Sequence, residues 1–218
     1  MKILITSGGT SEYIDDVRIL TNISSGKLGA IIADTFLKEG HSVMYLHGKN
    51  SKMPTKKTDM TPIEIDNANH LLSTLKMTLK YVDVVIHSMA VSDFSFKTEE
   101  HVKIKSNGVE GFIEYIKNNI KMNPKVISHI KKINPKVFLV GFKFESTGDL
   151  NKLMDSANKL MLENDCDLVL ANDKQDIIKN KSHIGYLISK TNPEIIKCKN
   201  KKEIANNILK LIEKEIVL

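Results

Sequence analysis

The first 46 residues place a strand, a glycine loop and an amphipathic helix in direct succession, which restricts the chain to an α/β fold. Residues 1–6 form a short apolar run typical of a strand, and the turn-forming residues Ser7 to Thr10 follow at once. From residue 24 apolar side chains recur at helical spacing as far as Gly40, a typical helix end, and residues 41–46 indicate another strand. The opening is therefore a β-loop-α-β unit.

The alternation of strands and helices continues along the chain. Residues 49–62 are interpreted as a connection, and residues 92–125 as an excursion that holds a small hairpin and a short helix. The other expected elements are a helix over 68–80, strands at 82–87 and 137–142, a helix over 150–163, a strand at 167–171, a hairpin of 184–189 with 194–197, and a last helix from 202 to about 216. This order predicts a Rossmann-like three-layer αβα fold, with a mostly parallel central sheet and a C-terminal antiparallel extension. Ligands of such folds lie at the carboxyl ends of the strands.

Composition favours one domain over residues 1–218, since 41% of the residues are hydrophobic and can bury a full core. The net charge of +6 is spread without a long basic run or a basic-aromatic motif, so nucleic acid is not an expected partner. No apolar stretch approaches membrane-spanning length, and Cys166 and Cys198 have neither metal-ligand spacing nor a disulfide framework. We therefore expect a soluble cytoplasmic protein with two inert cysteines.

Polar residues follow three of the expected strands, at Ser7 to Thr10, Ser88 to Asp93, and Ala171 to Asp173. Because Gly8 and Gly9 let the backbone approach a ligand closely, the first of these segments suits a phosphate group. A tight turn without any ligand is an equally good interpretation of the two glycines.

The segment from Thr21 to Gly29 carries serines and two glycines immediately before the first helix. Ser24 or Ser25 is the expected N-cap of that helix, and Gly29 would allow close packing. This structural interpretation does not account for the polar residues Asn22 and Arg18.

An NAD(P)-dependent oxidoreductase is the natural alternative, since a first βαβ unit is where a dinucleotide binds. The glycines lack the G-x-G-x-x-G spacing, however, and the second strand ends in Leu46-His47-Gly48-Lys49 instead of the acidic residue that holds a ribose.

Eight motifs in order resemble those of the phosphopantothenoylcysteine synthetase family, over nearly the whole chain. They are Gly8-Gly9-Thr10 with Glu12, Asp16-Val17-Arg18, Thr21 to Gly29, Met89-Ala90-Val91-Ser92-Asp93-Phe94, Lys103-Ile104-Lys105, Asn123-Pro124, Val140-Gly141-Phe142 and Ala171-Asn172-Asp173. The resemblance implies a stand-alone ligase of coenzyme A biosynthesis without flavin. It would join 4′-phosphopantothenate to L-cysteine through an acyl-nucleotidylate, with loss of pyrophosphate and release of a nucleoside monophosphate.

The resemblance also implies roles for individual residues. Asn22 and Lys103 would be catalytic, the amide of Asn22 donating to the substrate carbonyl and Lys103 binding the triphosphate. Arg18, Ala90 and Asp93 would bind phosphopantothenate, with Arg18 reaching the substrate phosphate across a homodimer interface. The expected nucleotide-binding residues are Gly9, Ser24, Gly26, Gly29, Lys105, Phe142, Lys159 and Asn172.

The nucleotide base is left open between CTP and ATP. CTP-using relatives carry two lysines one helical turn apart before the Ala-Asn-Asp strand, where this chain has only Lys159, and Lys143 is similar to members that use ATP. Mg²⁺ is expected with the nucleotide, its ligands unassigned. A nucleotide-binding protein without turnover is a third interpretation.

Overall fold

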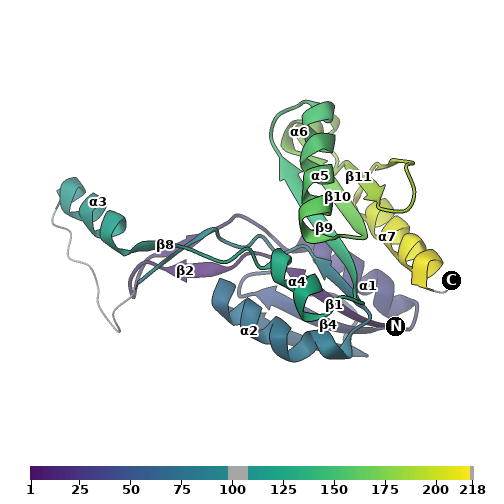
Figure 1. Cartoon of the computed structure of the whole chain (residues 1–218), viewed down its shortest axis with the longest axis horizontal. Helices are drawn as coiled ribbons and strands as arrows, with labels where there is room; N and C mark the ends of the chain where they lie inside the picture. The colour runs from purple at the N-terminus through teal and green to yellow at the C-terminus, as the bar shows by residue number, and fades with distance from the viewer. Residues whose placement is uncertain (98–107, 217–218) are drawn as a thin grey trace.

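The computed structural model describes residues 1–97 and 108–216 and centres on an eight-stranded sheet with the order β12-β11-β10-β9-β6-β1-β4-β5 (Figure 1). The strands are β1 (Lys2–Ser7), β4 (Ser42–Gly48), β5 (Met60–Ile65), β6 (Val84–His87), β9 (Phe138–Glu145), β10 (Leu168–Asp173), β11 (Gly185–Ser189) and β12 (Ile196–Cys198). Six of them, from β5 to β10 in the sheet order, pair in parallel, and β11 and β12 add an antiparallel edge. The expected mostly parallel sheet with a C-terminal antiparallel extension is confirmed.

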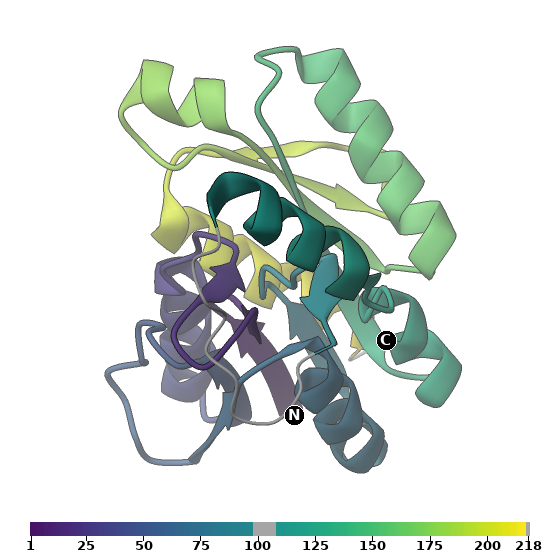
Figure 2. The same cartoon turned by 90° about the vertical axis from the view of Figure 1, so that its left-hand side faces the viewer.

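Helices cover both faces of the sheet, and the sheet separates two hydrophobic cores (Figures 1 and 2). On one face lie α1 (Lys27–Lys38) and α7 (Lys201–Ile216), which pack together through residues such as Phe36 and Ile208. On the other lie α2 (Ala68–Thr78), the 3-10 turn η1 (Leu79–Tyr81), α4 (Ile127–Ile133) and α5 (Leu150–Asn164). Strands β6 and β10 are buried along their whole length, as expected for parallel strands covered on both faces.

An arm extends from one end of the sheet and is drawn at the left of Figure 1. It contains two antiparallel pairs, β2 (Ser11–Tyr13) with β3 (Ile19–Thr21) and β7 (Phe94–Phe96) with β8 (Ile120–Met122), together with α3 (Gly108–Asn119). The expected helix is present as α3, but in place of a small hairpin the antiparallel strands β7 and β8 lie on either side of α3 in the sequence.

A buried carboxylate fastens the arm to the sheet domain. Glu12 accepts hydrogen bonds from the backbone N–H of Ala68, 2.9 Å away at the start of α2, and from Asn123 Nδ2 at 3.1 Å. Burial raises the pKa of Glu12, and these two donors act in the opposite direction. The position of β2 is therefore tied to that of α2 and to the end of β8.

The sequence interpretation was wrong or incomplete at several elements. Residues 60–65 form the edge strand β5, although the expected connection extended to residue 62 and no strand was expected here. Pro62 is tolerated because an edge strand leaves N–H positions unpaired. The N-cap of α1 is Gly26 in the left-handed region at φ 68°, with no side-chain capping bond, so neither Ser24 nor Ser25 has that role. The β2–β3 hairpin, α4 and the short helix α6 (Lys174–Asn180) were not anticipated.

Both cysteines are free and buried, and burial raises the pKa of Cys166 to about 12. The expectation that they are inert agrees with this geometry, because the reactive species is the thiolate. None of the helices in the described part of the chain has the length and apolarity needed to cross a bilayer.

Candidate functional site

A cavity of about 300 Å³ opens at the carboxyl ends of the parallel strands, on the face covered by α1 and α7. Ser7, Ser88 and Asn172 lie on its wall at or next to the ends of β1, β6 and β10, and Phe142 lies on it from within β9. The rest of the wall comes from the segment before α1 and its first turn, from the loop after β6, from β9, and from the C-terminal part of the chain: Ile23, Ser24, Ser25, Gly26, Lys27, Leu28, Gly29, Ala90, Lys143, Phe144, His183 and Lys201.

Glycines let three loops approach one another beside this cavity. A Cβ on Gly48 would lie 2.1 Å from the carbonyl oxygen of Gly9, and a Cβ on Gly9 would lie 2.6 Å from that of Asn22. A Cβ on Gly29 would lie 2.3 Å from Ser7 Oγ. Since such contacts are closer than real Cβ atoms show, these glycines are required by packing, and the backbone of the glycine loop lies directly against the segment before α1.

The first turn of α1 faces the cavity with features that favour an anion. The Ser7 hydroxyl donates to the carbonyl oxygen of Gly26, 3.2 Å away, which fixes the loop at the helix start. The first N–H groups of a helix lack partners within the helix, and the helix dipole places partial positive charge there. A phosphate in this cavity would therefore meet backbone donors.

Lysines add positive charge to the same cavity. Lys27 and Lys201 both lie on its wall, and the pKa of Lys201 is lowered, first by burial and then by the nearby charge of Lys27. Burial and the charge of Lys201 lower the pKa of His183 to about 4, so this imidazole is neutral at pH 7. An anionic ligand would offset the repulsion between the two lysines.

Asn172 and Asp173 at the end of β10 organise the far side of the cavity. Asn172 Nδ2 donates to the carbonyl oxygen of Ile184, 2.5 Å away, in the loop that carries His183. Asp173 caps α6 by accepting from Gln175 N and also accepts from Thr147 N and Gly148 N, at 2.7, 2.9 and 3.1 Å. Burial alone would raise the pKa of Asp173, but the hydrogen bonds outweigh it and the pKa is lowered.

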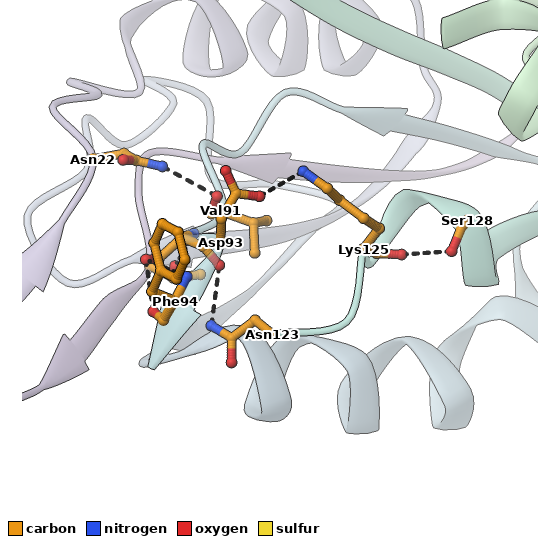
Figure 3. A network of polar contacts seen from close by, with 9 residues as sticks. Asn22, Val91, Asp93, Phe94, Asn123, Lys125 and Ser128 are labelled. Carbon is orange, nitrogen blue, oxygen red and sulfur yellow. Dashed lines mark hydrogen bonds and ion pairs between the residues drawn. The ribbon is translucent and has the colours of Figure 1, made fainter. Parts of the chain in front are cut away.

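The loop that follows β6 brings three predicted residues together (Figure 3). Asn22 Nδ2 donates to the carbonyl oxygen of Val91 at 3.1 Å, and Ala90 N donates to Gly8 O at 2.8 Å. Asp93 forms a 2.5 Å ion pair with Lys125, and its carbonyl oxygen accepts from the backbone N–H of Asn123. Asn22, Ala90 and Asp93 are thus held by one loop beside the cavity.

Other predicted residues lie on the cavity wall or away from it. Ser24, Gly26, Gly29, Phe142 and Asn172 line it, and Gly9 is packed against the carbonyl oxygen of Asn22. Lys159 is exposed on α5, where it pairs with Glu163 at 3.8 Å, and it does not line this cavity. Lys103 and Lys105 lie outside the described residues.

Arg18 lies on the arm, in the turn between β2 and β3. It forms a 2.6 Å ion pair with Asp15, and its guanidinium lies 5.6 Å from the centre of the Phe112 ring on α3. It does not line the cavity of its own chain.

Sequence reasoning missed Lys27, His183 and Lys201 as residues of the cavity. Lys27 lies within the Thr21 to Gly29 motif. Lys201 comes close to it only because α7 packs against α1. No local pattern marks one lysine among 32 basic residues as facing a cavity. Within residues 1–97 and 108–216 there is no group of three or more His, Cys, Asp or Glu side chains suited to a metal ion.

The chain is similar to a known protein family and to several of its members. Residues 1–216 match the model of the family described as the DNA/pantothenate metabolism flavoprotein C-terminal domain. The coenzyme A biosynthesis bifunctional protein CoaBC of Thermococcus kodakarensis is 33% identical over 215 residues, which are 98% of this chain and 51% of that protein. The chain spans about half the length of the curated relatives that it matches.

Two solved structures share the fold. The DNA/pantothenate metabolism flavoprotein of Streptococcus pneumoniae has 31% sequence identity and a TM-score of 0.84, with 99% of both chains covered. The Cab2 mutant H337A in complex with phosphopantothenate-cysteine has 20% identity and a TM-score of 0.78, with 99% of this chain and 87% of that chain covered. At 20% identity, the similarity to the Cab2 structure shows only that the two chains share a fold.

Proposed function

The chain belongs to the family of the DNA/pantothenate metabolism flavoprotein C-terminal domain, and on this basis we propose that it joins 4′-phosphopantothenate to L-cysteine in coenzyme A biosynthesis. The observation that carries the proposal is the placement of Asn22, Ala90 and Asp93 around one loop, beside a cationic cavity at the start of α1. The reaction would use a nucleoside triphosphate to convert the carboxylate into an acyl-nucleotidylate, whose nucleoside monophosphate the cysteine amine then displaces.

The nucleotide would occupy the cavity between α1 and β9. Its phosphates would lie against the first turn of α1 and near Lys27 and Lys201, where backbone donors and positive charge coincide. Phe142 and Asn172, on the opposite part of the wall, are suited to the base and ribose. CTP is the nucleotide that we favour, with ATP as the alternative.

Asn22 would stabilise the charge that develops on the reacting carbonyl oxygen. Its amide is already oriented by the bond to Val91, so little reorganisation would precede the reaction. The nucleophile is the amine of the substrate, and catalysis would consist mainly of positioning and electrostatic stabilisation.

Mg²⁺ would enter with the nucleotide. The ion commonly keeps several waters and is bound through substrate phosphates instead of an all-protein cage, which suits a cavity rich in lysine and backbone donors. It would neutralise phosphate charge as the α-phosphorus is attacked.

A homodimer formed through the arm would complete the site. The arm exposes apolar side chains to solvent, among them Tyr13, Ile19, Ile113 and Met122, each 47–66% exposed. Exposed apolar patches of this kind are typical of protein interfaces. In such a dimer, Arg18 would exchange its ion pair with Asp15 for the substrate phosphate at the partner's site.

Pyrophosphate release tests the proposal directly. Purified protein with 4′-phosphopantothenate, Mg²⁺ and either CTP or ATP should release pyrophosphate, and the amide product should form only when L-cysteine is also present. Folded protein that binds the nucleotides yet releases no pyrophosphate would instead support a nucleotide-binding role without turnover.

A further inference from the structure

His87 is the last residue of β6, and no step of the proposed function uses it. The residue is only 8% exposed, yet it lies on the wall of a second cavity of about 230 Å³. This cavity lies on the face of the sheet covered by α4 and α5, opposite to the nucleotide cavity. Asp93, proposed above to bind phosphopantothenate, lies on the same wall. A buried imidazole therefore borders the same space as a proposed substrate-binding residue.

Thr6 determines which nitrogen of the His87 ring carries the proton. The Thr6 hydroxyl lies 2.8 Å from His87 Nδ1 and also accepts a hydrogen bond from the backbone N–H of Met89 at 3.2 Å. Thr6 is fully buried, and the described residues offer its hydroxyl proton no acceptor other than Nδ1. A proton on Nδ1 would leave that buried donor unsatisfied, so the hydroxyl donates to Nδ1 and the ring proton is on Nε2.

The Nε2–H group is left open to the cavity. Among the described residues it has no partner, since the contact with Thr6 is the only hydrogen bond that the ring makes there. It is not sealed inside the protein either, because within residues 1–97 and 108–216 the one buried side-chain nitrogen or oxygen without a partner is Ser95 Oγ. The cavity wall thus carries an oriented N–H donor that a ligand can satisfy.

This donor is uncharged at pH 7. Burial lowers the pKa of His87 to about 4, and in the described part of the chain the ring has no carboxylate partner. The charged side chains on the cavity wall are Asp93 and Lys125, which form the 2.5 Å ion pair drawn in Figure 3. His87 therefore suits an uncharged acceptor oxygen and offers a phosphate no positive charge.

We propose that His87 is a substrate-binding residue whose Nε2–H donates to the amide carbonyl oxygen of 4′-phosphopantothenate. The inference rests on the proposed function and adds to it a contact with the uncharged middle of the substrate. Between its phosphate and its carboxylate, this substrate carries two methyl groups on one carbon, a hydroxyl and an amide. His87 donates to the amide oxygen, while the Asp93 carboxylate accepts from an N–H or O–H group of the same arm.

The remaining wall of the cavity agrees with this contact. Apolar side chains that suit the two methyl groups come from Met89, Val91, Ile127 and Leu160. The carbonyl oxygen of Val91 accepts from the Asn22 amide, so the cavity adjoins the residue proposed to act on the substrate carboxylate. A substrate held at His87 through its middle is thus within reach of Asn22.

Titration calorimetry with 4′-phosphopantothenate tests the contact without nucleotide or turnover. We expect His87→Leu, which removes the donor, to weaken binding about tenfold, whereas His87→Gln, which keeps an N–H donor at similar reach, should recover most of the affinity. Thermal unfolding verifies that both variants fold. His70→Leu, which replaces a partly exposed histidine on α2 away from the cavity wall, is the matched control.

NMR of the ¹⁵N-labelled histidine rings gives a second readout. The wild-type spectrum should show His87 in the Nε2–H form, and its Nε2 resonance should shift when the substrate is added. The ratio of the wild-type and His87→Leu affinities should be the same at pH 6 and pH 8, because the ring is neutral at both.

Three results would each overturn the assignment: a ring protonated on Nδ1, unchanged affinity in His87→Leu, or equal losses in the leucine and glutamine variants. A wild type that binds phosphopantothenate through His87 but releases no pyrophosphate would keep the assignment and remove the proposed activity. Pyrophosphate release with the same KM for phosphopantothenate in wild type and His87→Leu would keep the activity and remove the contact.

Discussion

The side-chain amide of Asn22 donates a 3.1 Å hydrogen bond to the carbonyl oxygen of Val91, 69 positions later in the chain. This bond joins the segment before α1 to the loop after β6, which are the two segments that flank the proposed reaction centre. It positions a side-chain donor where the proposed oxyanion develops, without burying a charge.

Replacement of Asn22 by alanine should therefore reduce product formation by about 10²–10³-fold, the usual effect of removing one oxyanion donor. The measurement is the rate of pyrophosphate release, with thermal unfolding as a check on the fold. Asn206→Ala, an exposed asparagine on α7, serves as control. An Asn22→Ala protein that turns over at the control's rate would remove Asn22 from the mechanism.

Lys201 should contribute to nucleotide affinity because burial and Lys27 hold its pKa down until an anion arrives. We expect Lys201→Gln to weaken binding of the Mg²⁺-nucleotide about tenfold, and the loss should shrink as salt concentration rises. Isothermal titration calorimetry measures both effects. Lys202→Gln changes the neighbouring exposed lysine of the same helix turn, and equal losses in the two variants would indicate only a general charge effect.

Asp173 should stabilise the fold in a pH-dependent way. Its pKa is lowered in the folded state, so its stabilisation is present above the ordinary carboxyl pKa of about 3.9 and is lost as the pH falls through the lowered value. Asp173→Ala should lower the free energy of unfolding by about 2 kcal/mol at pH 7, because a helix cap and buried N–H donors lose their acceptor.

Chemical denaturation at several pH values checks this expectation. The difference between wild type and Asp173→Ala should narrow in the acid range, while the exposed Asp155→Ala variant should stay close to wild type throughout. A difference that grows on acidification would contradict the assigned sign.

Replacement of Gly29 by alanine should destabilise the fold, although Gly29 lies inside a helix. Alanine normally stabilises a helix interior by about 1 kcal/mol relative to glycine, but here its Cβ would lie 2.3 Å from Ser7 Oγ and 2.7 Å from Ser7 Cβ. We expect Gly29→Ala to lower the melting temperature, and to lower it much less in a Ser7→Gly background. A higher melting temperature for the single variant would show that the contact relaxes without cost.

The arm should control association. Ile113 is 60% exposed on α3, so Ile113→Glu costs the isolated chain little yet would place a charge in the proposed interface. Analytical ultracentrifugation should show a shift from dimer to monomer for this variant. Ile178→Glu is the matched control, because Ile178 is 59% exposed on α6. A wild-type monomer at high concentration would contradict the dimer itself.

The parts of the fold that follow from periodicity were predictable, whereas those that depend on neighbours were not. Apolar runs gave the central strands, and the spacing of Leu153, Ala157 and Met161 gave α5. Strand β5 was not predicted because a proline such as Pro62 normally argues against a strand. The proline is acceptable here because β5 lies at the edge of the sheet. The N-cap of α1 was misassigned because a left-handed glycine stands in place of the expected serine cap. A Cβ at Gly26 would lie 3.0 Å from Ser51 Cβ and 3.1 Å from Ser7 Oγ, and this crowding depends on segments distant in the sequence.

The residues of the candidate site also divide into those that the sequence pattern predicts and those that depend on packing. Motifs at strand ends located Ala90, Asp93 and Asn172 in advance, since strand position alone places such residues at one edge of the sheet. Lys201 and His183 were not anticipated, because their approach to Lys27 depends on how α7 and the loop before β11 pack. The ion pair between Asp93 and Lys125 joins residues 32 positions apart, and no short motif encodes that pairing.

The packing of α7 against α1 also has a consequence for biosynthesis. Helix α1 begins at Lys27 and supplies the first turn of the nucleotide cavity, whereas Lys201 and the apolar face that completes the core belong to α7, near the end of the described chain. A chain emerging from the ribosome has the glycine loop and α1 long before α7 is available. The cavity can therefore assemble only after α7 has been synthesised, so a nascent chain that lacks α7 should not capture nucleotide.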